Sequence, residues 1–412
     1  MHRIEADLLI PGRGEPVTDG VVVLDGDRIT YAGPAAGAPP TPQASRRRAA
    51  AVLPGLWDCH GHFLGTRTLD LGRLPLQPLA LRAARCARDL RNALDAGVTS
   101  VREVGGLGVH LARAVAEGVL DGPAVYAAGA ILSTTGGHGD LHSFPLPWME
   151  DYARLEGTMC LADGEAACQR AVREQLRKGA RLIKVCASGG VLSELDDPIH
   201  QQFTAAELRT IVEVAGLAER AVAAHCHGKP GIMAALEAGV LTIEHGTYLD
   251  DECCDAMRET GAILVPTRTI IEDMLATDIA PDYATAKLRA VADKHAEAVA
   301  RAHKAGVTIA MGTDIALTGM ELPNSWGHNG SELAHLVTLG MTPLQAIEAA
   351  TATAPATLGR QAPRSGMLAA GYDADVITLD ADPLADISVL AQPAHVTGVW
   401  AAGRQVKGAG PE

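Results

Sequence analysis

The sequence predicts an α/β fold: a (β/α)8 TIM barrel with a small β-sandwich domain formed by the N- and C-terminal segments. Apolar runs alternate with amphipathic stretches eight times through the middle of the chain, as in a barrel of parallel strands. Short glycine turns typical of helix C-caps precede several of these runs. Strand-like segments with turn signals occupy both ends. An open doubly wound sheet is the alternative, but its glycine-rich fingerprint is missing.

The N-terminal segment predicts a small β region that cannot bury a core alone. Its strand candidates are residues 7–10, 20–24 and 29–33. Asp25-Gly26-Asp27 is a hairpin signal, whereas residues 34–49 are rich in alanine and proline and predict a loop. We therefore expect help from strands elsewhere in the chain.

The C-terminal segment returns to short apolar runs and supplies the missing strands. These candidates are residues 366–368, 374–379 and 395–401. We expect them to pair with the N-terminal strands, so that residues 1–52 and 359–412 form one composite β-sandwich domain.

Residues 53–358 are predicted to form the barrel. The motifs described below predict that it is a metal-dependent hydrolase domain. Its expected strands are residues 52–58, 98–102, 124–128, 181–187, 221–226, 240–244, 262–266 and 307–312. Its clearest expected helices are residues 78–96, 165–179, 204–219, 229–238, 250–260 and 284–305.

Composition and charge exclude several classes of partner. The formal net charge is −14, and Arg46-Arg47-Arg48 is the one basic run, so binding to a phosphate backbone is not expected. No apolar segment is long enough to span a membrane, and the N-terminus lacks the apolar core of a signal peptide. The eight cysteines are scattered, which indicates reduced thiols and a cytoplasmic protein.

The sequence Leu53-Pro54-Gly55-Leu56-Trp57-Asp58-Cys59-His60-Gly61-His62 carries the first chemical signal. An apolar run with turn residues predicts a buried strand, and alternate side chains of a strand share a face. His60 and His62 therefore point the same way. Imidazole is a common ligand of divalent metals, so this pair predicts half of a metal site.

Later strands add ligand-type residues at or near their C-terminal ends, which meet at one rim of a TIM barrel. Four histidines, one aspartate and one lysine occupy these strands: His60, His62, His225, His245, Asp314 and Lys184. Each alone has an ordinary structural explanation. Their convergence on one rim makes chance a poor explanation and predicts a metal site.

Lys184 lies inside an apolar run, and lysine is rarely buried without a partner. An ion pair with Glu244 or Asp314 is one explanation. The other is chemical: burial lowers the pKa of lysine, and a neutral amine can react with CO₂ to form a carbamate. That group can bridge two cations as a carboxylate does, and two cations can activate one water.

Several motifs together resemble the amidohydrolase superfamily, and particularly its imidazolonepropionase-like and prolidase-like (Xaa-Pro dipeptidase) branch. The motifs are PGLWDCHGH, IKVCASGG, AAHCHG, TIEHG, MGTD, SELAHLVTLGMTPLQAIEAAT and GYDADVITLDADPL. They include every strand that carries a predicted ligand. Imidazolonepropionases resemble a one-metal pattern without the bridging lysine, so Lys184 argues against that exact activity.

The resemblance implies a dinuclear metal centre that activates a bridging hydroxide for attack on an amide. It assigns the more buried metal to His60, His62 and Asp314. The second metal would be held by His225 and His245, and Lys184, N6-carboxylated, would bridge the two. Asp314 would also be the general base. Zinc is the default expectation for such ligands, although manganese, cobalt or iron would also fit.

Other residues are predicted to contact substrate. His138, in a glycine-rich loop after the third barrel strand, resembles the branch's substrate-contacting histidine. Tyr248 resembles its tyrosine that contacts a substrate oxygen. His227 shares the face of His225 and can orient a ligand. Arg268 can bind a carboxylate in a fork geometry, and His142 is a further candidate.

The leading hypothesis is therefore hydrolysis of a small-molecule amide or peptide bond next to a free carboxylate. Xaa-Pro dipeptides and N-acyl amino acids are the expected substrates. Aryl amides of the ochratoxin type, carbamates, ureas and cyclic amides remain alternatives. A non-catalytic binding or assembly barrel is a further alternative of a different class. By resemblance, a homo-oligomer is expected.

Overall fold

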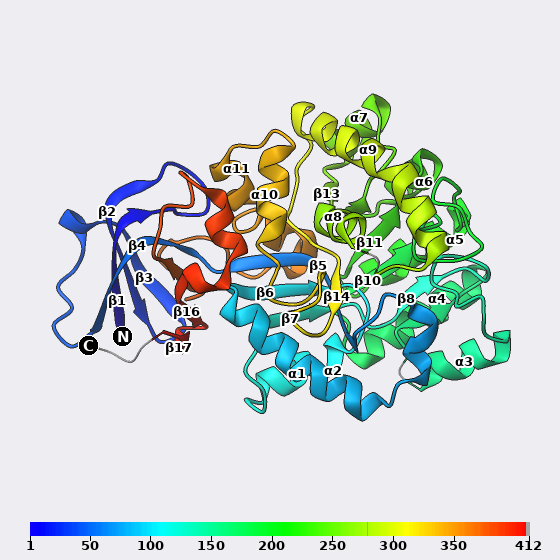
Figure 1. Ribbon diagram of the computed structural model, residues 1–412, viewed down its shortest axis with the longest axis horizontal. Helices are drawn as coiled ribbons and strands as arrows, with labels where there is room; N and C mark the ends of the chain where they lie inside the picture. The colour runs from blue at the N-terminus through cyan, green and yellow to red at the C-terminus, as the bar shows by residue number, and fades with distance from the viewer. Residues whose placement is uncertain (156, 278, 409–412) are drawn as a thin grey trace.

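The computed structural model describes residues 1–155, 157–277 and 279–408. Within these ranges the main strands form three sheets (Figure 1). The first, here called the terminal sheet, has the order β17-β16-β15-β4-β1-β2-β3. Its strands are β1 (His2–Leu9), β2 (Val17–Asp25), β3 (Arg28–Pro34), β4 (Ser45–Pro54), β15 (Val376–Leu379), β16 (Val396–Ala401) and β17 (Arg404–Lys407).

The terminal sheet joins the two ends of the chain. Strand β4 pairs with β1 in parallel and with β15 antiparallel, with Val52 opposite Thr378. The C-terminal strands therefore join the same sheet as the predicted N-terminal strands, through β4. In Figure 1 the blue N-terminal strands and the red C-terminal strands lie together at the left end of the molecule.

Two expectations for the terminal segments were wrong. The segment 34–49, predicted to be a loop, contains the start of β4. Arg46 and Arg48, two residues apart on this strand, are both exposed and form ion pairs with acidic residues of β1. Arg46 lies 3.5 Å from Glu5, and Arg48 lies 2.5 Å from Asp7. Residues 366–368 form no strand, and the amide of Leu368 instead donates to the Pro11 carbonyl in a loop contact.

The other two sheets consist of parallel strands. One has the order β14-β5-β6-β7 and the other β13-β12-β11-β10-β8-β9. The first contains β5 (Leu56–Thr66), β6 (Val98–Glu103), β7 (Ala124–Ala127) and β14 (Ile315–Leu317). The second contains β8 (Ile131–Ser133), β9 (Met159–Leu161), β10 (Leu182–Cys186), β11 (Ala221–Cys226), β12 (Thr242–His245) and β13 (Ile263–Val265).

Helices follow most of the parallel strands and cover them (Figure 1). They are α1 (Leu79–Asp95), α2 (Gly108–Ala116), α3 (Leu146–Arg154), α4 (Glu165–Lys178), α5 (Ala205–Gly216), α6 (Lys229–Ala238), α7 (Asp251–Thr260), α8 (Arg268–Ala276), α9 (Asp282–Lys304), α10 (Ser331–Thr338) and α11 (Pro343–Ala349). Among the described residues, no helix combines the length and apolar character needed to cross a membrane.

The predicted barrel strands are recovered except at the first and last. The expected strand 52–58 divides at Gly55 into the end of β4 and the start of β5. The expected strand 307–312 is reduced to a bridge between Ile309 and Leu264. Its backbone still forms hydrogen bonds with β13. The Leu264 amide donates to the Thr308 carbonyl, and the Ala310 amide donates to the Leu264 carbonyl. These parts of the chain therefore form an α/β fold of parallel strands and covering helices.

Candidate active site

One cavity is lined by residues of β5, β10, β11 and β12. Its polar lining consists of His60, His62, His138, Lys184, His225, His227, His245 and Asp314. Apolar residues from the end of β5, from β8 and β9, from α8 and α9 and from the segment after β10 form the rest of the lining. All six predicted metal ligands thus line one cavity.

The first group of ligand-type residues joins β5 to the segment that precedes β14. Ligand atoms of His60, His62 and Asp314 all lie within 4.8 Å of one another, and the group can hold a metal ion. Nε2 of His62 is 3.0 Å from Oδ1 of Asp314, and Nε2 of His60 is 3.5 Å from it. Asp314 has a φ of 61°, a strained conformation that occurs often at functional sites.

Asp58 aligns the two chain segments of this first group. Its Oδ1 accepts from the backbone amides of His60 and Thr313, at 3.0 and 3.1 Å. Its Oδ2 accepts from the Thr313 hydroxyl and from Nδ2 of Asn329. The amide of Asp314 in turn donates to the His60 carbonyl at 2.7 Å. A buried carboxylate therefore sets the distance between His60 and Asp314.

The second group lies at the ends of β11 and β12. Ring nitrogens of His225, His227 and His245 also lie within 4.8 Å of one another. The predicted pair His225 and His245 comes together, and His227 joins it as a third ring. His245 has a φ of 70°, so this group too contains a strained ligand-type residue.

Hydrogen bonds assign which nitrogen each ring presents. Nδ1 of His62 donates to the Gly105 carbonyl at 2.7 Å, and Nε2 of His225 donates to the Gly189 carbonyl at 3.1 Å. Nδ1 of His245 donates to the Thr267 hydroxyl, because that hydroxyl itself donates to the Pro266 carbonyl. In a neutral imidazole, the nitrogen opposite the donating one then keeps its lone pair for a metal.

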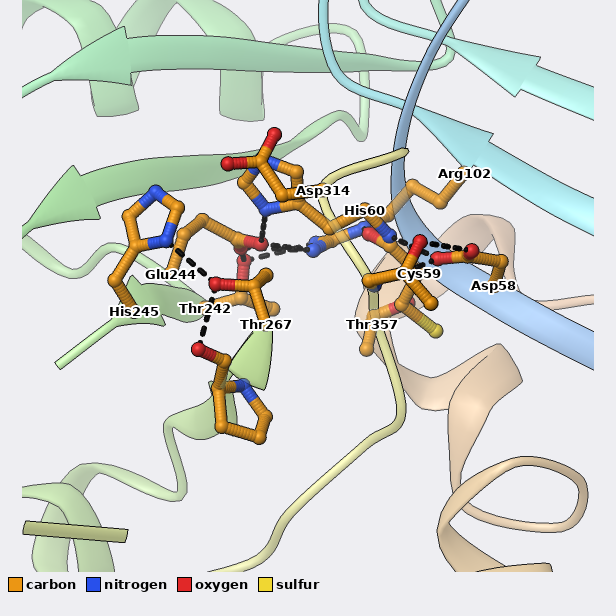
Figure 2. Close-up of polar contacts among 12 residues, drawn as sticks. Asp58, Cys59, His60, Arg102, Thr242, Glu244, His245, Thr267, Asp314 and Thr357 are labelled. Carbon is orange, nitrogen blue, oxygen red and sulfur yellow. Dashed lines mark hydrogen bonds and ion pairs between the residues drawn. The ribbon is translucent and has the colours of Figure 1, made fainter. Parts of the chain in front are cut away.

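His60 is oriented by a buried ion pair that the sequence analysis did not assign to the site. Figure 2 shows the Glu244 carboxylate between His60 and Arg102. Oε2 of Glu244 lies 2.6 Å from Nδ1 of His60, and Nη2 of Arg102 lies 2.7 Å from both carboxylate oxygens. The Thr242 hydroxyl also donates to Glu244. A charge inside an apolar strand, the signal that identified Lys184, would also have identified Arg102 and Glu244.

Lys184 fits the role of a bridging group between the two clusters. It is 2% exposed, and its Nζ has no hydrogen-bond partner among the described residues. Burial lowers its pKa, although the Glu244 carboxylate opposes the shift. Its charge acts on His60 and His62 and also on His225 and His245. An unpartnered buried amine is costly, so this atom is suited to carry a further group.

Burial also favours neutral imidazoles, the form that binds metals. Together with the nearby Lys184, it lowers the pKa of His60 to about 4. Burial and the neighbouring His138 lower the pKa of His227 to about 3. His62 is the exception: burial opposes the change, but its hydrogen bond with Asp314 raises its pKa.

Comparison with known proteins identifies the family. Residues 51–406 match the model of the Amidohydrolase family. The chain is 44% identical to ochratoxinase of Aspergillus niger over 99% of this chain and 87% of that protein. It superimposes on the crystal structure of that enzyme with a TM-score of 0.92, over 99% and 96% of the two chains at 43% identity.

The chain belongs to the amidohydrolase family. A prolidase crystallised with N-methylphosphonate-L-proline matches with a TM-score of 0.90 at 32% identity, over 99% of this chain and all of that chain. Imidazolonepropionase of Streptomyces griseus subsp. griseus is 27% identical over 96% and 95% of the two chains. The resemblance inferred from the motifs is therefore confirmed.

As an amidohydrolase, the protein is an enzyme that acts on amide bonds of small molecules. The alternative of a non-catalytic barrel is set aside by this membership. The two groups of histidines can bind metal ions, in keeping with the metal dependence that is typical of the family.

The structure places the predicted substrate-contacting residues in different surroundings. His138 lines the cavity and stacks on His225 with ring centroids 4.2 Å apart. Tyr248 does not line it, and its backbone amide donates to the His227 carbonyl. His142 accepts from the Leu195 amide at the edge of this region.

Arg268 is directed away from the cavity. Its Nε donates to Glu272 at 2.8 Å, and its Nη1 donates to the Ala292 carbonyl at 2.6 Å. Arg268 is the first residue of α8, and its side chain turns toward α9. The structure therefore does not form the carboxylate-binding fork that we expected of it.

Proposed function

We propose that this amidohydrolase cleaves the amide bond between a bulky apolar acyl group and an amino acid, with ochratoxin-type aryl amides as the first candidates. The observation that carries the proposal is the cavity, whose ligand-type residues face apolar walls. Ile271 and Met274 of α8 and Leu288 and Val291 of α9 contribute to these walls. The 44% identity to an ochratoxinase supports the same class.

The residues fit two divalent metal ions, for which zinc is the first choice. His60, His62 and Asp314 would hold one ion, and His225 and His245 the other. Lys184 would bridge them after its neutral Nζ has attacked the carbon of CO₂ and released a proton, which gives a carbamate. When bound, such ions polarise a carbonyl group and lower the pKa of water.

The remaining steps belong to the side chains. A carboxylate oxygen of Asp314 would take a proton from the attacking water and pass it to the leaving nitrogen. His138 and His227, both at the cavity surface, would contact the substrate beside the scissile bond. The apolar walls would bind the acyl group and exclude other water from the reacting atoms.

We also infer that the two parallel sheets are parts of one closed barrel, and that the terminal sheet belongs to a second domain. Backbone hydrogen bonds between the sheets support closure. The Arg181 amide, next to β10, donates to Ala127 of β7. On the other side, the segment before β14 joins the sheets, because the Cys59 amide of β5 donates to Met311 and the Leu264 amide of β13 donates to Thr308.

Hydrolysis of Xaa-Pro dipeptides is the second candidate. The match to a prolidase crystallised with N-methylphosphonate-L-proline supports it. The two candidates differ in the acyl group that they require, because a dipeptide can bring a small aliphatic group where an aryl amide brings a ring.

The test is a substrate panel with the purified, zinc-loaded enzyme. It compares an ochratoxin-type aryl amide, N-benzoyl- and N-acetyl-phenylalanine, and Ala-Pro. Burying a ring contributes about 1.5–3 kcal/mol, so kcat/KM is expected to be about 10–100-fold higher for benzoyl than for acetyl. A clear preference for Ala-Pro would replace the proposal with the prolidase assignment. Metal content near two ions per chain is expected.

A further inference from the structure

The segment of residues 188–202, here called the β10 loop, is held by one lysine of α9. Nζ of Lys287 donates to the carbonyls of Gly190, at 3.2 Å, and Ser193, at 2.7 Å. It also donates to the carbonyl of Asp196 and lies 3.4 Å from its Oδ1. The Lys287 side chain is 20% exposed, so its charge is largely withdrawn from water and bound by the loop.

Asp196 extends this contact toward the candidate active site. Its side chain is 6% exposed. Oδ2 of Asp196 accepts from the Gly190 amide at 2.9 Å and from Nε2 of Gln202 at 3.1 Å. Oε1 of Gln202 accepts from the His138 amide at 3.0 Å. A continuous chain of polar contacts therefore runs from Lys287 to His138.

The β10 loop forms part of the cavity. Val191 and Leu192 belong to its apolar lining, and the Gly189 carbonyl accepts from Nε2 of His225. Gly190 packs against the His138 ring so closely that a Cβ there would lie 2.1 Å from Nδ1. The loop thus touches both the apolar wall and the histidine pair.

Little regular structure holds the β10 loop in place. It contains no helix or ladder of strands, and its one β-bridge joins Ser188 to Gln201 near its two ends. The middle of the loop therefore depends on side-chain contacts for its shape. Lys287 supplies the largest group of these contacts, and the Tyr283 hydroxyl adds one to the Leu192 carbonyl at 3.3 Å.

We infer that Lys287 is a positioning residue that holds the β10 loop against α9 and thereby sets both the apolar wall and the place of His138. Its effect on substrate choice rests on the proposed function, because it assumes an apolar acyl group beside Val191 and Leu192. The effect of Lys287 on the position of the β10 loop does not depend on the proposed function. Loss of the ammonium removes hydrogen bonds of a charged group, which are stronger than those of neutral groups.

The test compares Lys287→Met with Lys294→Met in the full-length, zinc-loaded enzyme. Lys294 lies on the same helix, but its side chain is 55% exposed and pairs with Glu297. The first readout is amide hydrogen exchange in residues 188–202. The second is kcat and KM for N-benzoyl- and N-acetyl-phenylalanine, with metal content measured in each variant.

For Lys287→Met, exchange in the β10 loop is expected to be at least about tenfold faster. The benzoyl-to-acetyl ratio of kcat/KM is expected to fall about tenfold, mainly through KM for the benzoyl substrate, with metal content unchanged. Lys294→Met is expected to match the wild type in every readout. Lys287→Arg, which keeps the charge, should recover part of both effects.

Equal exchange in the two methionine variants would overturn the inference. Faster exchange with an unchanged substrate ratio would overturn the role in substrate choice. If the wild type cleaves none of the acyl amino acids, the proposed function fails, and exchange alone decides whether Lys287 holds the loop. If Lys287→Met does not fold, Asp196→Asn replaces it, with smaller changes expected in the same directions.

Discussion

A buried pair of opposite charges, Glu244 and Arg102, orients a ligand-type residue of the candidate active site. Glu244 and Arg102 are both 0% exposed and lie 142 residues apart in the sequence. Burying an ion pair is costly unless its remaining hydrogen bonds are satisfied, and here Thr242 and His60 satisfy them. The cost is understandable if the pair serves to hold the His60 ring in one orientation.

Replacing Glu244 tests that explanation. Glu244→Gln keeps the shape of the side chain but removes the charge that faces Arg102 and His60. Loss of such an orienting partner typically weakens metal binding about 10–100-fold, and we expect this effect in competition with a chelator. Glu237→Gln, at an exposed position of α6, is the control. Unchanged metal affinity in Glu244→Gln would show that His60 is oriented without it.

Lys184 offers a second test at this scale. Lys184→Ala is expected to lose bound metal and nearly all hydrolysis, because the bridging carbamate cannot form. Short carboxylic acids such as propionate should restore part of the activity by taking the place of the carbamate. Metal analysis and rate assays on Lys184→Ala and on the exposed control Lys294→Ala measure this. Full rate and two metals in Lys184→Ala would remove the bridge assignment.

At the scale of elements, the expected helices match the structure closely, whereas the first and last of the expected barrel strands do not. The expected helix at residues 229–238 is α6 itself, and the expected helix at 284–305 differs from α9 by only a residue or two at each end. Helix limits depend on nearby caps and periodicity. Strand limits depend on a partner strand, so the reduced strand near Ile309 had no local signal, whereas Pro54-Gly55 did mark the division between β4 and β5.

Helix α1 contains a buried carboxyl that links stability to pH. Oδ2 of Asp89 accepts from the Thr318 hydroxyl at 2.5 Å, and Oδ1 has no partner among the described residues. Burial raises the pKa of Asp89 to about 7 from its ordinary 3.8. Between about pH 4 and pH 7, the Asp89 carboxyl of the folded protein therefore retains a proton that the same group has lost in the unfolded chain. The stability that this proton gives is complete below pH 4 and is lost as pH rises through about 7.

Asp89→Asn should remove this dependence. Between pH 5 and 8 the wild type should lose about 2–3 kcal/mol of unfolding free energy through Asp89, and the variant should not. Urea denaturation at both pH values, in the same metal buffer, measures the difference. Asp95→Asn, in the same helix with a side chain that is 35% exposed, should keep the wild-type dependence. An equal change in unfolding free energy between pH 5 and 8 in all three proteins would disprove the assignment to Asp89.

At the scale of the whole molecule, the C-terminal segment both completes the terminal sheet and packs on the helices. A short 3₁₀ helix, η4 (Ile387–Ala391), lies against α10. Gly330, just before α10, approaches it so closely that a Cβ would lie 1.8 Å from the Leu390 carbonyl oxygen. The segment that leads to β16 is thus fixed to the helical layer by backbone contact.

Gly330→Ala is expected to destabilise the protein by about 1–3 kcal/mol, because the added methyl group meets rigid backbone. Gly216→Ala is the matched control, since a Cβ at Gly216 meets no atom within 4 Å; it should be neutral or slightly stabilising. Chemical denaturation of both variants measures the difference. Equal stability would mean that the two backbones can separate at little cost.

The sequence by itself determined that the fold is α/β with parallel strands, that both chain ends contribute to one sheet, and which ligand-type residues line one cavity. These follow from local periodicity and from the rule that parallel strands end at the same edge. Only the tertiary structure decided that Glu244 and Arg102 orient His60, that Arg268 turns away, and that Lys287 holds the β10 loop. Each of these depends on contacts between segments far apart in the chain, and such contacts leave no regular spacing in the sequence.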